Sequence, residues 1–530
     1  MLLVKKRISV IFDLKLIIKE ICAISAEKYV EIVNLIINYR KDDMMMYESK
    51  LYKMFKKHLT QNSERVAIII NDVQTTYKEL FERINAWKNF FESVGVNKGD
   101  RLIISTDHRL EFIASWLSLW SIGAIPIPME PVARAPELTR AIEAGKPHLI
   151  CSENREHLNA LPKNSEIFNC NLQPSWVIAK INTDNDIDSG KDSAFFAYTS
   201  GTTGAPKCVI YDIEGTVAIL ESLIKAFKLT PEDVFMTPLN PSLPSVIFTA
   251  ILPSLAAGST LVLLDEPIPR RALKVMAQTG TTVFFAVPYF YRLMNETMSV
   301  KAVQRFEHLR LCVSTSAFLD NHTFNEFYKY TGVPIRSIFC SSEAFYCTFY
   351  GGDDIEILRK SCGTTLEGVK IKVADKEDNE VPLLTEGQIL VSGTHKSKGY
   401  FCRPELEEKV FKNGWVHTGD LGYLDEEGYL YITGRISHTI NVGGHLVNPQ
   451  EVESILISYP GISEAMILGE KDPMIGERVI AKVVLKEGAE IEEKEVIEFC
   501  KKMLLKYKVP ERIEIVESLP KSRYGKIRRM

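Results

Sequence analysis

The sequence predicts an α/β protein with a large N-terminal domain of mixed sheets and helices and a small α+β C-terminal domain. From about residue 64, short apolar runs such as Val66–Ile70 and Arg101–Ser105 alternate with longer stretches of helical spacing. Tyr77–Val94 and Leu110–Ile122 are such stretches, and this alternation is typical of parallel strands covered by helices. After Arg435 the pattern changes to helix, strand, strand, helix and strand, which fits a compact domain of its own.

Length and composition agree with this fold and exclude several classes of protein. The 530 residues allow two to four domains, and 45% hydrophobic with 25% charged residues is ordinary for a globular chain. The net charge of -4 gives no basic excess for binding nucleic acid or an anionic membrane. None of the 10 cysteines forms a Cys-x-x-Cys pair, which argues against a zinc knuckle and favours single thiols in the reducing cytoplasm.

Two segments need separate interpretation. Residues 235–264 carry no charge and are long enough to span a bilayer, but they contain four prolines and a glycine that interrupt a helix. We therefore expect a loop, a short helix and a buried strand there, and no stable membrane insertion.

Residues 1–45 are rich in Ile and Lys and end in Met44–Met46; we interpret them as an extension, either a mis-assigned start or an amphipathic helix. The predicted domains are then 46–434 and 436–530. The helix-breaking residues within 235–264 are Pro238, Pro241, Pro244, Pro253 and Gly258.

The segment Tyr198–Lys207 predicts a phosphate-binding loop. It follows the apolar strand Ala194–Ala197, and its hydroxyl groups and glycine backbone can surround an anion while Lys207 adds a positive charge. It is not a P-loop, because the lysine follows Pro206 and precedes Cys208. The residues predicted to contact phosphate are Thr199, Ser200, Gly201, Thr202, Thr203, Gly204 and Lys207.

With four further segments, this loop closely resembles the adenylate-forming superfamily, which includes acyl- and aryl-CoA synthetases, stand-alone adenylation enzymes and firefly luciferase. The matching segments occur in family order over roughly residues 50–530: Phe339–Glu343, Trp415–Asp420, Gly434–Glu453 and Pro520–Lys526. The resemblance implies a C-terminal domain on a hinge and an active site between the domains. It also implies an acid–thiol ligase that converts ATP and a carboxylic acid to acyl-adenylate and pyrophosphate. A thiol, either CoA or the phosphopantetheine of a separate carrier protein, then gives a thioester and AMP.

The resemblance assigns roles to individual residues, and their chemistry suits those roles. Glu343, a carboxylate near a phosphate loop, is implied to bind Mg²⁺, and Asp420 in its glycine-flanked turn is implied to accept hydrogen bonds from the ribose. Lys526 is implied to bridge the substrate carboxylate and the α-phosphate, where it stabilises charge at phosphorus. The other implied contacts are Phe339 on adenine, Ser316 beside it, Ser342 at the α-phosphate, Arg435 at the ribose, and Gly443 and Gly444 along the thiol arm.

The chain departs from the family where the acid should bind. Asn240–Pro244 replaces the usual aromatic or histidine gate, Thr315 and Cys340 replace glycines, and Ser437 or His438 stands at the hinge. No carboxylate is present at 240–245 to pair an α-ammonium, which favours an aryl or fatty acid over an amino acid. An amino-acid-activating enzyme and a non-catalytic family member remain the alternatives. The predicted substrate pocket comprises Ser242, Leu243, Ser314 and Ala344.

Overall fold

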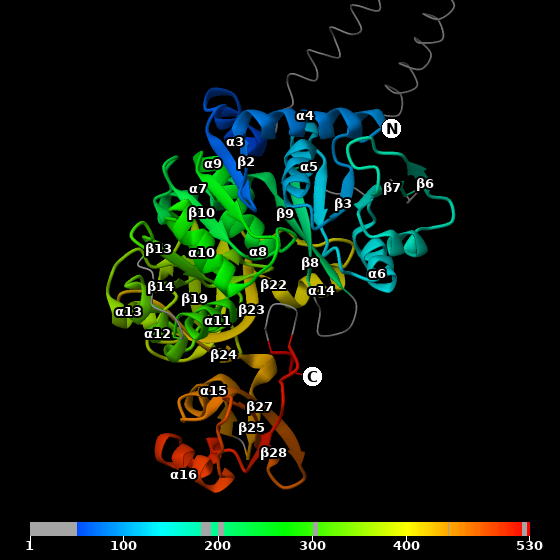
Figure 1. Cartoon of the computed structure of the whole chain (residues 1–530). Coiled ribbons are helices and arrows are strands. Elements are labelled where there is room, and N and C mark those ends of the chain that lie inside the picture. Colours follow the sequence, from blue (N-terminus) through cyan, green and yellow to red (C-terminus); the bar gives the residue numbers. More distant parts are fainter. Residues whose placement is uncertain are drawn as a thin grey trace, which may run out of the picture. The chain divides into compact units, whose positions relative to one another are not determined.

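The computed structural model describes residues 50–181, 192–199, 206–299, 306–443, 445–521 and 527–529, with side chains at most of these positions. Figure 1 shows the chain as a series of sheets with helices packed around them. The described part begins with α3 (Lys50–Gln61), which buries Leu51, Tyr52, Phe55 and Leu59 in the main hydrophobic core.

The largest sheet is parallel except at one edge. Its strand order is β14-β13-β12-β10-β11-β1-β2, and only β2 runs antiparallel to its neighbour. A parallel sheet places the carboxyl ends of its strands at one edge, where binding sites are commonly found. The strands are β1 (Val66–Ile70), β2 (Val73–Thr76), β10 (Val234–Thr237), β11 (Thr260–Leu263), β12 (Val283–Ala286), β13 (Leu311–Ser314) and β14 (Ile335–Ser337).

A second sheet has the order β4-β3-β5-β7-β6, in which β3 is parallel to both of its neighbours. Along β3, Leu102 and Ile104 belong to the main core and Ile103 to a second cluster, because successive strand residues point to opposite faces. Both faces of this sheet are therefore covered. Its strands are β3 (Arg101–Ser105), β4 (Ile125–Pro128), β5 (Leu149–Ser152), β6 (Glu166–Phe168) and β7 (Val177–Lys180).

Helices α4 (Tyr77–Ser93) and α5 (Arg109–Ile122) pack side by side (Figure 1). Helix α4 begins with a capping box, because the Thr76 hydroxyl accepts from the Glu79 N–H and the Glu79 carboxylate accepts from the Thr76 N–H. Helix α5 is buried on nearly every side, including Trp116 and Trp120, so its sequence is apolar throughout rather than amphipathic.

The remaining N-terminal sheets are largely antiparallel. One small sheet joins β8 (Ser193–Thr199), β9 (Lys207–Asp212) and β21 (Gly399–Tyr400), and the strand pair β15 (Cys340–Ser341) and β16 (Phe345–Tyr346) forms a hairpin. A five-stranded sheet follows: β19 (Val369–Ala374), β20 (Gly387–Gly393), β22 (Phe411–Lys412), β23 (Trp415–Leu424) and β24 (Leu430–Arg435). Further elements are α6 (Ala135–Gly145), α7 (Ile213–Phe227), α10 (Pro269–Thr279), α11 (Pro288–Ser299), α12 (Asn321–Thr331), α13 (Ile355–Lys360), α14 (Pro404–Val410), β17 (Thr348–Phe349) and β18 (Thr364–Thr365).

The C-terminal part has its own sheet and its own hydrophobic cluster, which includes Val452, Ile467, Ala481 and Val496. The order helix, strand, strand, helix and strand predicted after Arg435 is present, with an additional hairpin before it. The elements are β25 (Ile440–Val442), β26 (His445–Val447), α15 (Pro449–Ile457), β27 (Ile462–Asp472), β28 (Gly476–Leu485), α16 (Glu493–Met503) and β29 (Arg512–Ile515).

The predicted fold class is confirmed: a mixed α/β chain with a large N-terminal part and a small C-terminal one. The uncharged stretch 235–264 forms β10, a loop, α8 (Pro244–Val246), a π-helical turn (Ile247–Ile251), α9 (Leu252–Ala257) and β11, as its breakers predict. Among the described residues, no helix is long and apolar enough to cross a membrane. The extension 1–45 lies outside the described residues, which begin at Lys50.

Candidate active site

Glu343 lies in the turn of the β15–β16 hairpin, half-buried, where Cys340 pairs with Tyr346 and Ser341 with Phe345. Its carboxylate accepts a hydrogen bond from the Tyr400 hydroxyl, with 2.6 Å between the oxygens, and its carbonyl accepts one from the Ser397 N–H at 2.9 Å. Within the described part of the chain, Glu343 forms no ion pair with any lysine, arginine or histidine. One hydrogen bond from a neutral hydroxyl therefore leaves most acceptor positions of the carboxylate available to a ligand.

Tyr400 also contacts the end of the predicted phosphate loop. Lys207 opens β9 opposite Thr199, and Tyr400 pairs with Val209 of the same strand. The Lys207 ammonium lies 5.0 Å from the centroid of the Tyr400 ring, which is a cation–π distance. Burial raises the pKa of Tyr400 well above its usual value, and the Glu343 charge adds to this effect, so the hydroxyl remains a proton donor.

Asp420 and Arg435 face each other on β23 and β24. The Arg435 Nε lies 2.9 Å from an Asp420 carboxylate oxygen, and the Arg435 Nη2 donates to the Thr418 carbonyl at 3.1 Å. The Thr418 hydroxyl accepts from the Asp420 N–H at 3.1 Å, and Gly419 between them has a φ of 73°, which favours glycine. The sequence predicted a glycine-flanked turn here, but Asp420 lies within strand β23, whose pairing with β24 brings it opposite the exposed Arg435.

The residues predicted around adenine lie between β13 and β15. Phe339 is 7% exposed, and its N–H donates to the Thr348 hydroxyl at 3.2 Å, so its ring is packed as part of the main core. Ser316 is exposed and has a φ of 74°, and Ser342 is exposed with its carbonyl accepting from the Tyr211 hydroxyl. The two serines are thus accessible to a ligand, while Phe339 is packed mainly against protein.

The four predicted pocket residues are mostly buried. Ser242 is 3% exposed and its hydroxyl donates to the Asn240 side-chain oxygen at 2.8 Å, whereas Leu243 is half-buried ahead of α8. Ser314 and Ala344 are 1% and 0% exposed, and the Ser314 hydroxyl has no hydrogen-bond partner among the described residues. None of the four lines the cavity described below, but Asn240 does.

One tyrosine links the loop 240–245 to the hairpin that carries Glu343. The Tyr346 hydroxyl lies 2.8 Å from the Thr249 hydroxyl and donates to the Ser245 carbonyl at 3.1 Å. The neighbouring residue adds a second contact, because the Phe345 and Phe248 rings pack edge to face with centroids 4.9 Å apart. The predicted substrate loop and the predicted metal-binding segment are therefore in direct contact.

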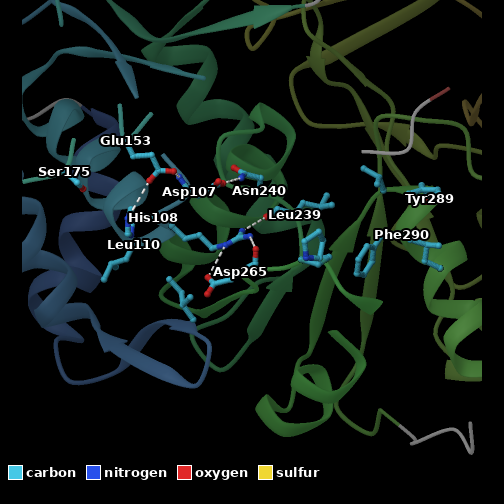
Figure 2. Close-up of a pocket in the computed structure, with 16 residues that line it drawn as sticks. Asp107, His108, Leu110, Glu153, Ser175, Leu239, Asn240, Asp265, Tyr289 and Phe290 are labelled. Carbon is cyan, nitrogen blue, oxygen red and sulfur yellow. Dashed lines mark hydrogen bonds and ion pairs between the residues drawn. The ribbon is translucent and has the colours of Figure 1, made fainter. Parts of the chain in front are cut away.

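A cavity of about 960 Å³ opens where the strands of the two main sheets end (Figure 2). Its walls come from the turns after β3, β5, β10, β11 and β12, which is the carboxyl edge expected for a site in parallel sheets. Asp107, His108 and Glu153 form a charged end, and Tyr289 and Phe290 lie at the opposite, apolar end (Figure 2). The remaining lining residues are Ile70, Arg109, Leu110, Ser175, Pro238, Leu239, Asn240, Asp265, Pro267, Val287 and Leu293.

Hydrogen bonds hold this cavity and the substrate loop together. Arg109 is 6% exposed and donates to the Leu239 carbonyl at 3.0 Å and to the Asp265 carbonyl at 2.9 Å. The Asn240 amide donates to the Asp107 carboxylate at 2.7 Å. Sequence reasoning named Asn240 but missed Asp107 and Glu153, although Asp107 lies two residues after β3 and Glu153 directly follows β5, positions at which parallel sheets carry functional side chains.

Several predicted site residues lie outside the described residues: Ser200, Gly201, Thr202, Thr203, Gly204, Gly444 and Lys526. Gly443 is described; it is exposed, has a φ of 60°, and donates its N–H to the Ile475 carbonyl at 2.6 Å. An added Cβ there would meet nothing within 4 Å, so the backbone conformation is the structural reason for glycine.

Comparison with known proteins identifies the family. Residues 55–401 match the model of the AMP-binding enzyme family, and residues 451–526 match the AMP-binding enzyme C-terminal domain. This chain belongs to the AMP-binding enzyme family. The predicted resemblance to adenylate-forming enzymes is thereby confirmed.

Relatives and solved structures cover nearly the whole chain. The oxalate–CoA ligase of Arabidopsis thaliana is 26% identical over 90% of this chain and 96% of its own length. The medium-chain fatty-acid–CoA ligase of Escherichia coli is 29% identical, with 88% and 87% covered. The crystal structure of ATP-bound MatB from Rhodopseudomonas palustris aligns with a TM-score of 0.78 at 27% identity, covering 91% of this chain and 97% of that one. Together with the family match, these relatives confirm the predicted class, an acid–thiol ligase.

Proposed function

We propose that this enzyme activates an aryl or fatty acid with ATP and transfers the acyl group to CoA. One observation supports this most directly. Lys207, at the end of the phosphate-loop segment, and the carboxylate of Glu343 both contact the same buried side chain, Tyr400. ATP activation of an acid brings anions together, and a cation next to a metal-binding carboxylate suits that chemistry. The relatives named as CoA ligases favour CoA as the thiol, and the phosphopantetheine of a separate carrier protein is the alternative acceptor.

Mg²⁺ fits the residues present. The described residues contain no group of three or more His, Cys, Asp or Glu side chains that could hold a metal by themselves. Mg²⁺ usually binds through one or two carboxylates together with substrate phosphates and water, so the single carboxylate of Glu343 is sufficient. We propose that Glu343 and the ATP phosphates hold the ion, which would neutralise charge on the departing pyrophosphate.

The nucleotide is proposed to lie between the phosphate loop and the Asp420–Arg435 pair. Thr199 and Lys207, with the loop between them, contact the phosphates, and Ser342 faces the α-phosphate. Asp420 accepts from the ribose hydroxyl groups while Arg435 supports it from the next strand, 2.9 Å away. Phe339 and Ser316 border the adenine.

Two steps complete the proposed reaction. An oxygen of the substrate carboxylate attacks the α-phosphorus, and the bond to the β-phosphate bridging oxygen breaks, so pyrophosphate leaves with the electron pair. The thiolate then attacks the acyl carbon, and AMP leaves with the electrons of the acyl–oxygen bond. Lys526 is proposed to stabilise the charge at phosphorus in the first step, and Gly443 and Gly444 to line the approach of the thiol arm in the second.

The Lys526→Ala variant tests this division of labour. We expect it to abolish adenylate formation, measured as ATP–pyrophosphate exchange, because the lysine charge acts only at phosphorus. Thioester formation from supplied acyl-adenylate should be spared. An equal loss in both half-reactions would contradict the proposed role.

The cavity supports an acid with an uncharged tail. Its volume of about 960 Å³ lies in the range of small-molecule sites, and its apolar end is formed by Tyr289, Phe290 and Leu293. The charged end carries Asp107 and Glu153 together with Arg109, so the proposal places the uncharged tail at the apolar end, away from these charges. Because Asn240 both lines the cavity and accepts from the Ser242 N–H at 2.9 Å, a tail in the cavity would reach the substrate loop.

A panel of acids in ATP–pyrophosphate exchange tests the proposed substrate class. We expect exchange with aryl or medium-length fatty acids to exceed that with any amino acid by at least about tenfold, which is about 1.4 kcal/mol of transition-state preference. Strongest exchange with an amino acid would point to Asp107 or Glu153 as the counter-ion of its ammonium. Absence of exchange with every acid would favour the non-catalytic alternative.

A further inference from the structure

Tyr400 is a buried side chain that joins two predicted parts of the site but was assigned no role by the sequence. We propose that Tyr400 is a positioning residue with two contacts. Its hydroxyl orients the Glu343 carboxylate toward Mg²⁺–ATP, and its ring holds the Lys207 ammonium in place through a cation–π contact. This inference rests on the proposed function, because it takes Glu343 as the metal ligand. Tyr400 itself contacts neither the metal nor the substrate in this proposal.

The backbone around Tyr400 is fixed on both sides. Strand β21 pairs with β9, and the next residue, Phe401, donates its N–H to the Cys208 carbonyl at 2.8 Å. The Tyr400 N–H donates to the Glu407 carboxylate at 2.8 Å, and the ring is only 2% exposed. A side chain held in this way can position a partner, because its own rotamer is locked by packing.

The hydroxyl orients the Glu343 carboxylate without neutralising it. It donates to one carboxylate oxygen at 2.6 Å, which leaves the second oxygen and the remaining lone pairs available. An arginine or lysine in this place would orient the group but also compete with the metal for its charge. Partners of ligating carboxylates commonly act in this way, and their loss weakens metal binding by about 10–100-fold.

The ring has a second, separable role. Lys207 lies 5.0 Å from its centroid, so the ring holds the cation at the end of the phosphate loop. The Tyr400→Phe variant removes the hydroxyl bond to Glu343 and keeps the ring under Lys207. Tyr400→Leu removes both contacts, and comparison of the two variants separates metal positioning from lysine positioning.

The experiment measures Mg²⁺ dependence and nucleotide binding. We expect Tyr400→Phe to raise the Mg²⁺ concentration for half-maximal pyrophosphate exchange about tenfold, with kcat at saturating Mg²⁺ changed less than threefold. Calorimetry should show weaker binding of ATP with Mg²⁺ and unchanged binding of ATP in EDTA. Tyr400→Leu should weaken ATP binding both with Mg²⁺ and in EDTA, because Lys207 loses its contact with the aromatic ring.

Tyr77→Phe is the matched control. Tyr77 is also buried, and its hydroxyl donates to the Ser259 carbonyl at 2.8 Å, away from every residue placed in the site. Tyr77→Phe should lose about as much stability as Tyr400→Phe and keep the wild-type Mg²⁺ dependence of pyrophosphate exchange. A double variant, Tyr400→Phe with Glu343→Gln, should bind Mg²⁺–ATP no more weakly than Glu343→Gln alone.

Three results would overturn the inference: a Mg²⁺ dependence of Tyr400→Phe equal to that of Tyr77→Phe, equal losses of ATP binding with and without Mg²⁺, or additive losses in the double variant. Failure of the proposed function would look different. The wild-type enzyme would then exchange pyrophosphate with no acid, while calorimetry with Mg²⁺–ATP would still decide the role of Tyr400.

Discussion

The two carboxylates predicted from the sequence, Glu343 and Asp420, lie in opposite electrostatic settings. Asp420 faces the guanidinium of Arg435 at 2.9 Å, so its charge is balanced within the protein. Glu343 accepts a hydrogen bond from a neutral phenol and forms no ion pair among the described residues. A balanced carboxylate suits a neutral diol such as ribose, whereas an unbalanced one attracts a metal cation.

The surroundings of Asp420 extend this contrast. Burial raises the pKa of Cys362 to about 12, and the negative charge of Asp420 acts in the same direction. Burial raises the pKa of the Cys347 thiol as well. These thiols therefore stay neutral beside Asp420 and do not add negative charge to the nucleotide region. The comparison teaches that the partner of a carboxylate, more than its residue type, indicates which ligand it can take.

The largest effect is expected from Glu343→Gln. The variant keeps the acceptor for Tyr400 but removes the charge proposed to hold Mg²⁺, so we expect pyrophosphate exchange to fall at least about a hundredfold. The loss should be greatest at low Mg²⁺ and partly relieved by excess metal. If the variant kept the wild-type Mg²⁺ requirement, Glu343 would not be the metal ligand, and the contrast with Asp420 would disappear.

Asp420→Ala should produce a different pattern. The ribose loses its acceptor and Arg435 loses its partner, so ATP affinity should fall about 30-fold, or about 2 kcal/mol, by calorimetry. The loss should be the same with Mg²⁺ and in EDTA, because the proposed contact involves the ribose alone. Asp425→Ala is a matched control: Asp425 lies in the same hairpin and accepts the Tyr429 N–H at 2.8 Å. It should affect stability without changing ATP affinity.

The sequence predicted both carboxylates but neither of their settings. The strands β1 and β3 have the bounds that the sequence predicted, because apolar runs mark buried strands. The two-residue strands β15, β16 and β21 carry no such periodicity, and the bond from Tyr400 to Glu343 spans 57 positions of the chain. Local patterns contain no information about such long-range pairs.

The cavity illustrates the same limit. Its walls come from five separate turns, and Asp107 meets Asn240 only because β3 and β10 end on the same side. The predicted pocket residues lie in three short segments of the chain, and the structure buries Ser242, Ser314 and Ala344 instead of exposing them to the cavity. Whether those residues or the cavity turns select the acid is tested by the panel of acids proposed above.

The smallest effect is expected from Thr418→Val, which probes how the backbone of β23 holds Asp420. The Thr418 side chain is 7% exposed; its hydroxyl donates to the Ile389 carbonyl at 2.8 Å and accepts from the Asp420 N–H at 3.1 Å. Valine has a similar shape, so the free energy of unfolding should fall by about 1–2 kcal/mol in chemical denaturation. The KM for ATP should rise only about twofold, because the Asp420–Arg435 pair is retained. A rise in KM as large as that of Asp420→Ala would mean that the local backbone geometry of β23, rather than the ion pair, determines ribose binding.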